Sequence, residues 1–219
     1  MPEKSRTYLV IGLGTFGRAV ALELQRFGNH VVGIDLKETA VADMAEELSE
    51  AVIADARDEE ALRAAGAEDA DVAVIATASD LESSVMAAIN LRMLGVPTIW
   101  AKATTRTHHR ILAKLGVDRI VHPEEEQARH LAQMLHNPFV RDYVAVGNGS
   151  SIFNVTVPAG LKGRALGDLP MRRHDLRVLG VIRGTEFLGA EGAACTLAEE
   201  DRLLILGKRA DLRAFASKL

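Results

Sequence analysis

A glycine-rich turn near the N-terminus limits the folds open to this chain more than any other feature. Gly12, Gly14 and Gly17 follow an apolar run and open a helical pattern, the context in which G-x-G-x-x-G indicates a dinucleotide-type site. Gly12 permits a tight turn, Gly14 lets backbone approach a phosphate chain, and Gly17 lets the helix pack on the sheet. The turn therefore predicts a Rossmann unit whose N–H groups face an anion; the alternative is a purely structural strand-to-helix turn.

Short β-branched runs alternate with helical patterns as far as His136, which predicts a parallel sheet wound with crossover helices. Gly28 and Gly95 should end helices, and Pro123 should open one. The expected strands are residues 8–12, 30–35, 51–54, 71–76, 98–102 and 119–122.

The pattern changes at Asn137-Pro138 to short alternating strands with Gly-rich turns. We expect strands at 143–146, 151–157, 177–183, 186–188 and 202–206, and a closing helix from Ala210. The predicted architecture is α/β: a Rossmann-like doubly wound domain over residues 1–136, a linker over 137–142, and a small α+β domain over 143–219.

Asp35 ends the second strand about 20 residues past the turn, where this fold places an acid that accepts hydrogen bonds from ribose hydroxyls. An Asp here repels a 2′-phosphate and so disfavours NADP, although Lys37 lies close by. A plain surface carboxylate is the alternative for Asp35.

Other polar residues follow strand ends, where open α/β sheets bind ligands. Ser79 or Asp80 could instead cap the next helix. Lys102 is expected to contact phosphate, with an ordinary surface lysine as the alternative. The predicted nucleotide-binding set is Gly12, Leu13, Gly14, Thr15, Phe16, Gly17, Asp35, Leu36, Lys37, Asp55, Ala56, Thr77, Ala78, Ser79 and Lys102.

Composition narrows the function classes. A formal charge of −4 gives no basic field for nucleic acid. The single cysteine, Cys195, excludes an intrachain disulfide, and the polar first residues do not form a signal peptide. No apolar stretch approaches the roughly 20 residues of a membrane span. No histidine pair has i, i+4 spacing, which argues against a transition-metal site. We therefore expect a cytoplasmic protein.

Four segments together resemble the regulator-of-potassium-conductance (RCK) domains of Ktr- and Trk-type potassium uptake subunits. They are the string Tyr8-Leu-Val-Ile-Gly-Leu-Gly-Thr-Phe-Gly17 with Ile34-Asp35, the string Ile99-Trp-Ala-Lys-Ala103, and above all His108-His-Arg-Ile-Leu-Ala-Lys-Leu-Gly-Val-Asp118-Arg-Ile-Val-His-Pro-Glu124. The segment from Tyr143 resembles the C-terminal RCK lobe, so the resemblance spans nearly the whole chain.

The resemblance implies a regulatory subunit rather than an enzyme. Such proteins form rings, typically octamers, bind ATP, ADP or NAD(H), and transmit ring shape to a membrane potassium-translocating partner at the inner face of the cell membrane. It further implies that Lys102 approaches phosphate and that Glu124 helps to hold a divalent or monovalent cation near intersubunit nucleotide sites. Some relatives bind cyclic di-AMP in the C-terminal lobe.

One departure from the family pattern concerns the glycine turn. Ktr-type subunits often carry Arg where this chain has Thr15, and that Arg is associated with the terminal phosphate of ATP. Arg18 lies one turn into the helix. Two rival functions stay open: an NAD-dependent oxidoreductase or redox sensor with His122 as proton donor, and an interaction module that no longer binds nucleotide.

Overall fold

The computed structural model describes residues 5–77, 80–189 and 195–216. Contacts divide the chain into two compact units after Glu124, which lies in the first turn of helix α6 (Pro123–His136). Each unit is described by itself below. The domain limits expected from the sequence, 1–136 and 143–219, remain a prediction.

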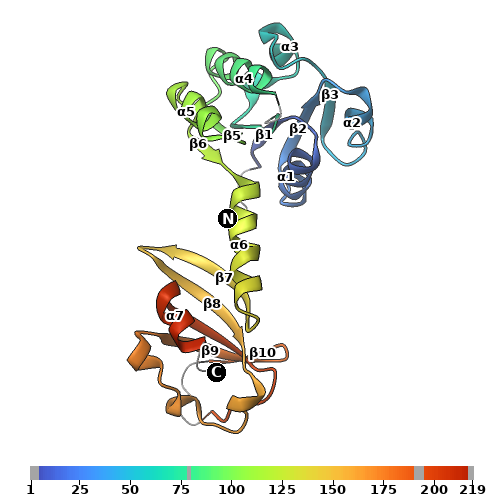
Figure 1. The fold of residues 1–219 in the computed structure, drawn as a ribbon. Helices are drawn as coiled ribbons and strands as arrows, with labels where there is room; N and C mark the ends of the chain where they lie inside the picture. Colours follow the sequence, from blue (N-terminus) through green and yellow to red (C-terminus); the bar gives the residue numbers. More distant parts are fainter. Residues whose placement is uncertain (1–4, 78–79, 190–194, 217–219) are drawn as a thin grey trace. The chain divides into compact units, whose positions relative to one another are not determined.

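The N-terminal unit contains a parallel sheet with the strand order β3-β2-β1-β4-β5-β6 among the described residues (Figure 1). The strands are β1 (Thr7–Ile11), β2 (His30–Asp35), β3 (Glu50–Ile53), β4 (Val72–Ile75), β5 (Thr98–Lys102) and β6 (Arg119–Val121). Tyr8 of β1 pairs with Val31 of β2 on one side and with Val72 of β4 on the other. The strand order reverses at β1 and β4, so the predicted doubly wound sheet is confirmed and its switch point lies beside the glycine turn.

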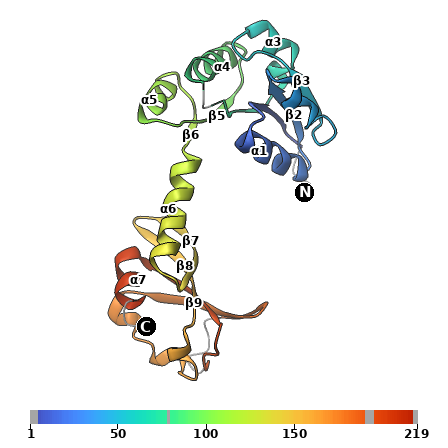
Figure 2. The same ribbon diagram turned by 45° about the vertical axis from the view of Figure 1, so that its right-hand side comes forward.

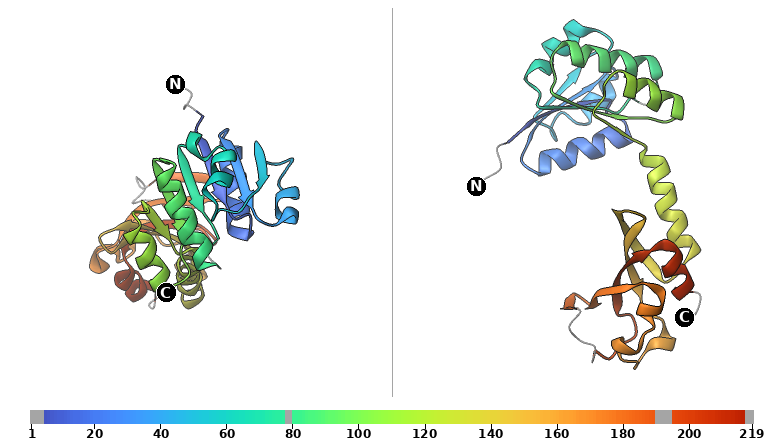
Figure 3. Two further views of the ribbon diagram at one scale, coloured as in Figure 1. Left: turned by 90° about the horizontal axis from the view of Figure 1, so that it is seen from above. Right: turned by 90° about the vertical axis from the view of Figure 1, so that its left-hand side faces the viewer.

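Helices cover both faces of this sheet, as Figure 3 (right) shows with blue α1 on one side and green α4 and α5 on the other. The helices are α1 (Thr15–Arg26), α2 (Glu38–Ala42), α3 (Glu59–Ala64), α4 (Leu81–Met93) and α5 (Arg106–Lys114), with a 3₁₀ turn at Ala67–Asp69. Leu62, Leu91 and Leu112 bury α3, α4 and α5 on one face, and Ala21 and Val41 bury α1 and α2 on the other. The continuous apolar strands follow from this double cover.

The helix ends follow the sequence signals. Gly28 and Gly95 have φ of 80°, a conformation that glycine adopts without strain, and their N–H groups donate to Gln25 and Arg92 carbonyls. Both predicted helix stops are confirmed, as is the start of α6 at Pro123.

The C-terminal unit contains an antiparallel sheet with the order β10-β9-β11-β8-β7 among the described residues. Its strands are β7 (Val140–Gly147), β8 (Ser150–Thr156), β9 (Arg177–Arg183), β10 (Glu186–Gly189) and β11 (Arg202–Lys208). Helix α7 (Arg209–Ala216) lies against β11 (Figure 2), and Phe215 joins Phe153 and Ile205 in the core. Three 3₁₀ turns, Ala159–Leu161, Leu166–Asp168 and Met171–His174, connect β8 to β9.

Strand β7 begins at Val140, inside the segment expected to be a linker, rather than at Tyr143. Val140 is buried and pairs with Val155 of β8. A register shift follows between Val140 and Asp142, and this bulge breaks the simple alternation that the sequence pattern relies on. The hydrophobic periodicity of the sequence therefore could not locate the start of this strand.

Candidate functional site

A pocket of about 920 Å³ lies at the carboxyl ends of β1, β2, β3 and β4. This volume is within the range of sites for small ligands and cofactors. Of the predicted binding residues, those lining it are Gly12, Leu13, Gly14, Thr15, Asp35, Leu36, Lys37, Asp55, Ala56 and Thr77. The sheet topology thus brings together residues from four separate segments of the chain.

Each glycine of the turn is explained by a different feature of the structure. A Cβ at Gly17 would lie 1.8 Å from the Gly12 carbonyl oxygen, and Gly12 itself has φ of 93°. These two residues must be glycine for the strand and helix to meet. A Cβ at Gly14 would meet nothing within 4 Å, so packing inside the protein leaves the space over this backbone open to the pocket.

Helix α1 begins beside this open space. Gly14 is its N-cap and supplies no side-chain hydrogen bond. The N–H groups of a first helical turn lack intrahelical partners and carry the positive end of the helix dipole. The start of α1 can therefore bind an anionic group.

Asp35 is half-buried at the end of β2 and is fixed from two sides. The Leu13 N–H donates to Oδ2 at 2.7 Å and the Lys37 N–H donates to Oδ1 at 2.9 Å. Each carboxylate oxygen has a second lone-pair direction. Asp35 can thus join the glycine turn to β2 and still accept hydrogen bonds from a diol.

Asp55 lies in the loop after β3 and is paired with Arg57, a pocket residue that the sequence analysis missed. Arg57 Nη2 is 2.6 Å from Oδ2, and Arg57 Nε and the backbone N–H both donate to Oδ1 at 3.0 Å. The hydrogen bonds from Arg57 hold the pKa of Asp55 below its usual range. The pocket therefore presents an ionised carboxylate at the end of β3.

Thr77 closes the pocket at the end of β4. Its Oγ1 is buried without a hydrogen-bond partner in the described structure, and its methyl carbon would be 2.8 Å from a Cβ at Gly12. Ala78 and Ser79 lie outside the described residues. Asp80 caps α4, accepting from the N–H groups of Glu82 and Ser83, as the alternative for that residue predicted.

Lys102 lies outside the pocket lining as described and forms an ion pair with Glu124. Its side chain is only 13% exposed, and its Nζ is 5.4 Å from the centre of the Phe16 ring in the glycine turn. The ammonium group holds the pKa of Glu124 below its usual range. Phe16, Lys102 and Glu124 therefore form a second cluster beside the turn.

Arg18 lines the pocket but is committed to two neighbours. Its Nε donates to the Leu13 carbonyl at 2.7 Å, and its Nη2 lies 2.8 Å from Asp43 Oδ2. These bonds direct the guanidinium toward α2. Thr15, which starts α1, is exposed in the same pocket.

His109 and His122 form a pair that spacing could not predict, because it joins α5 to the end of β6. Their rings stack with centroids 5.1 Å apart, and His109 Nδ1 is 2.9 Å from His122 Nε2. Neither ring is among the described residues that line the pocket. In the described ranges, no group of three or more His, Cys, Asp or Glu side chains is arranged to hold a metal ion.

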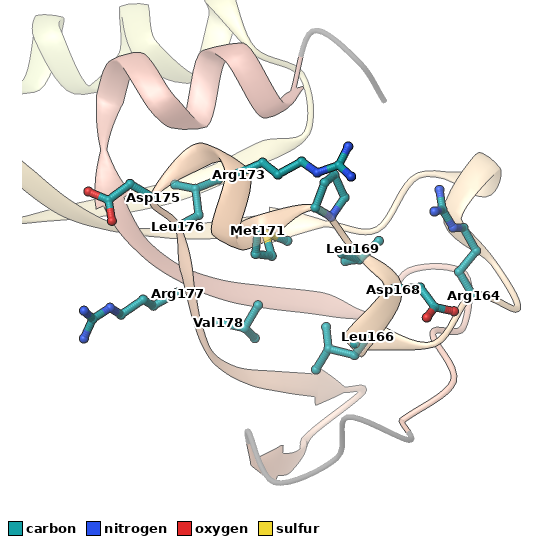
Figure 4. Close-up of a pocket in the computed structure, with 12 residues that line it drawn as sticks. Arg164, Leu166, Asp168, Leu169, Met171, Arg173, Asp175, Leu176, Arg177 and Val178 are labelled. Carbon is teal, nitrogen blue, oxygen red and sulfur yellow. The ribbon is translucent and has the colours of Figure 1, made fainter.

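A second hollow, of about 1200 Å³, lies in the C-terminal unit around the 3₁₀ turns before β9. In Figure 4 its apolar side chains occupy the middle, with Asp175 and Arg177 at one end and Arg164 and Asp168 at the other. Arg173 is a further cation in the lining. The hollow thus combines an apolar floor with a rim of arginines and acids.

Comparison with known proteins follows the same division. Residues 8–123 match the TrkA-N domain and residues 151–219 match the TrkA-C domain. The Ktr system potassium uptake protein A of Bacillus subtilis (strain 168) is 30% identical over 216 residues, covering 98% of this chain and 97% of the relative. The chain belongs to the Ktr and TrkA family of potassium uptake proteins. The resemblance to Ktr-type RCK subunits is confirmed.

Two solved structures resemble the fold. The GsuK channel bound to NAD has a TM-score of 0.66 at 16% identity, covering 97% of this chain and 39% of that chain. The Kef C-terminal domain of Shewanella denitrificans in its AMP-bound form has a TM-score of 0.51 at 25% identity, covering 59% of this chain and 79% of that chain. In the described ranges, the Ktr-like chain has no helix long and apolar enough to cross a membrane.

Proposed function

We propose that this chain is the nucleotide-binding regulatory subunit of a potassium uptake system. The observation that carries the proposal is the open backbone at Gly14, next to the uncapped start of α1. A ligand phosphate fits this space because it accepts hydrogen bonds from helix N–H groups. The unpartnered Thr77 Oγ1 and the fixed Asp35 carboxylate lie in the same pocket.

A nucleotide is assigned to the pocket in three parts. Phosphates lie at the turn, the ribose hydroxyls bond to Asp35, and the base lies toward Asp55, because β3 is the strand beyond β2. The AMP-bound Kef domain supports an adenine nucleotide at such a fold. Thr15 supplies no cation and Arg18 is tied to Asp43, so discrimination of ATP from ADP is expected to be weak.

Lys102 and Glu124 provide the regulatory contact in this proposal. A phosphate beside Phe16 competes with Glu124 for the Lys102 ammonium group, which is too buried to remain unpaired. Glu124 is 67% exposed, so it can turn away and help to bind a cation. Because Glu124 stands in the first turn of α6, the exchange changes the charge at the start of that helix.

The output of the subunit is gating rather than chemistry. The described pocket lining contains no histidine or cysteine that could serve as nucleophile or base. The family places such chains with Ktr-type potassium uptake, and we propose an octameric ring at the cytoplasmic face of a membrane potassium-translocating subunit. Differential affinity of the nucleotide for two ring conformations supplies the switch.

Cyclic di-AMP is proposed as a second ligand, in the C-terminal hollow. Arg164, Arg173 and Arg177 line it, and guanidinium groups are suited to phosphate oxygens. Titration of cyclic di-AMP into wild type and an Arg173→Ala variant tests this assignment. Equal affinity of the two proteins would contradict it.

Calorimetric titration of ATP, ADP and NADH into the purified full chain tests the main proposal. We expect wild type to bind at least one of them and Asp35→Ala to bind at least ten-fold more weakly, roughly the cost of losing charge-assisted hydrogen bonds. No binding at micromolar protein would overturn the proposal. Hydride transfer that depends on His122 would instead favour the oxidoreductase.

A further inference from the structure

The loop after β3 holds an ion pair, Asp55–Arg57, to which the proposed function gives no role. Its residues Asp55 and Arg57 both line the pocket, with side chains 32% and 43% exposed. The guanidinium lies against the carboxylate through Nε and Nη2, which is the bidentate geometry that fixes both groups in one plane. The pair is therefore a rigid part of the pocket wall.

The loop beneath this pair is itself held in place. The Ala56 carbonyl accepts a hydrogen bond at 3.1 Å from Asn90 Nδ2 on α4, and Asn90 is 4% exposed. Asp58 caps α3 by accepting from the N–H groups of Glu60 and Ala61. Since the loop is anchored at its middle and at its far end, the direction of the Asp55 carboxylate depends on Arg57 rather than on loop motion.

The position of the pair identifies the part of a nucleotide that it faces. Asp35 pairs with Ile53 at the end of β3, so Asp55 stands two residues beyond the level of the ribose acid, in the loop that follows the next strand outward. A ligand with phosphates at β1 and ribose at β2 has its base at the end of β3. An ionised carboxylate there accepts from an exocyclic amine and repels a carbonyl oxygen.

We infer that Arg57 is a positioning residue that makes the pocket select adenine over 6-oxopurines, by holding the Asp55 carboxylate toward the 6-position of the base. The inference rests on the proposed nucleotide site. Adenine presents an N6 amino donor at this position, whereas guanine presents the O6 acceptor; hypoxanthine also has a 6-oxo group. Hydrogen-bonded discrimination of this kind changes affinity by about ten-fold or more.

The test compares ADP with IDP, which has hypoxanthine in place of adenine, by calorimetric titration at pH 7 into the full chain. Wild type should bind ADP at least about ten-fold more tightly than IDP. Arg57→Ala should lose most of that ratio by weakening ADP while leaving IDP nearly unchanged. Arg57→Lys, which keeps the charge but not the bidentate geometry, should recover only part of the ratio.

Two further variants separate positioning from folding. Asp55→Asn, whose amide can donate to a 6-oxo group, should reduce or reverse the preference for ADP. Arg63→Ala is the matched control, because Arg63 lies on the neighbouring helix α3, outside the described pocket lining. It pairs with Glu59 and Glu60 on α3 and with Glu68 in the 3₁₀ turn that follows. Arg63→Ala should keep the wild-type ratio.

A pH series gives a readout that a purely structural role would not move. Loss of Arg57 returns the pKa of Asp55 toward its ordinary value, so ADP binding by Arg57→Ala should weaken at a higher pH than in wild type as the solution is acidified. Equal affinities of wild type for ADP and IDP, or proportional loss of both in Arg57→Ala, would overturn the inference. Failure of wild type to bind either nucleotide would instead contradict the proposed function.

Discussion

The two units of this molecule build their pockets in different ways. In the N-terminal unit, the pocket lies at a strand switch point and its shape follows from backbone: the glycine turn, the strand ends and the start of α1. In the C-terminal unit, the hollow lies among 3₁₀ turns and its character comes from side chains, mainly Leu and Arg. A backbone-built pocket has a sequence signature, whereas a side-chain-built one does not.

The largest expected effects come from variants that test whether the two units are stable independently of each other. Phe153 is fully buried in the C-terminal core and Leu91 in the N-terminal one. Phe153→Ala should destabilise its unit by about 3–5 kcal/mol, and Leu91→Ala should destabilise the other by a similar amount. Scanning calorimetry and ADP titration should show that only Leu91→Ala abolishes nucleotide binding. Loss of nucleotide binding in Phe153→Ala would instead show that the two units unfold together as one cooperative system.

Gly17→Ala sharpens the claim that backbone shapes the N-terminal pocket. The added methyl would meet the Gly12 carbonyl oxygen at 1.8 Å, and neither backbone segment can move without disturbing β1 or α1. We expect a loss of about 3 kcal/mol in the free energy of unfolding, together with loss of nucleotide binding. Urea denaturation measures the first. An unchanged midpoint would mean that the turn can relax.

Asp201→Asn is the corresponding test of side-chain structure in the C-terminal unit. Asp201 is 1% exposed and accepts from Arg183 Nε, Arg183 Nη2 and the Ala198 N–H. The Asn amide nitrogen would face the N–H donors of Arg183 and Ala198, which should lower the free energy of unfolding by about 1–3 kcal/mol. The exposed pair Lys162–Glu199 provides the control, since Glu199→Gln should leave the unfolding midpoint unchanged.

The same residue sets an acid dependence. Arg183 lowers the pKa of Asp201 in the folded state, so its contribution is complete above the unfolded value of about 3.9 and is lost as pH falls through the lower folded value. Below about pH 4, wild type should lose stability faster than Asp201→Asn. Parallel loss in both proteins would assign the acid sensitivity elsewhere.

Gly14→Ala should have the smallest effect on stability and a selective effect on binding. The new methyl has open space, and alanine at an N-cap costs under about 1 kcal/mol relative to glycine. In contrast, nucleotide affinity should fall clearly, because the methyl occupies the space assigned to phosphate. If Gly14→Ala bound nucleotide as tightly as wild type, the assignment of the phosphate to the space over Gly14 would be contradicted.

The sequence predicted the parallel sheet and the position of the glycine turn because both depend on local patterns. Apolar runs and glycines at fixed spacing survive in the chain as readable signals, and Asp35 follows from counting along it. The Asp55–Arg57 pair was within reach too, since an acid and an arginine two residues apart in a loop can form a local ion pair.

Other contacts could not be predicted because they join distant segments. Lys102 and Glu124 are 22 residues apart and were each assigned to ligands. The fold brings them together because Lys102 ends β5 and Glu124 lies in the first turn of α6, just after the neighbouring strand β6. The His109–His122 stack joins a helix to a strand end. The C-terminal hollow depends on turns without a periodic pattern, so its arginines carried no signal.

The hydrogen bond between the Leu13 amide and Asp35 has a kinetic consequence. It fixes, before any ligand binds, the side of the pocket that the proposed function assigns to the ribose. Ordering a loop at the moment of binding reduces affinity and slows association, and this side of the pocket avoids both effects. Under the proposed function, a subunit preorganised in this way would respond to nucleotide without first having to order this side of the pocket.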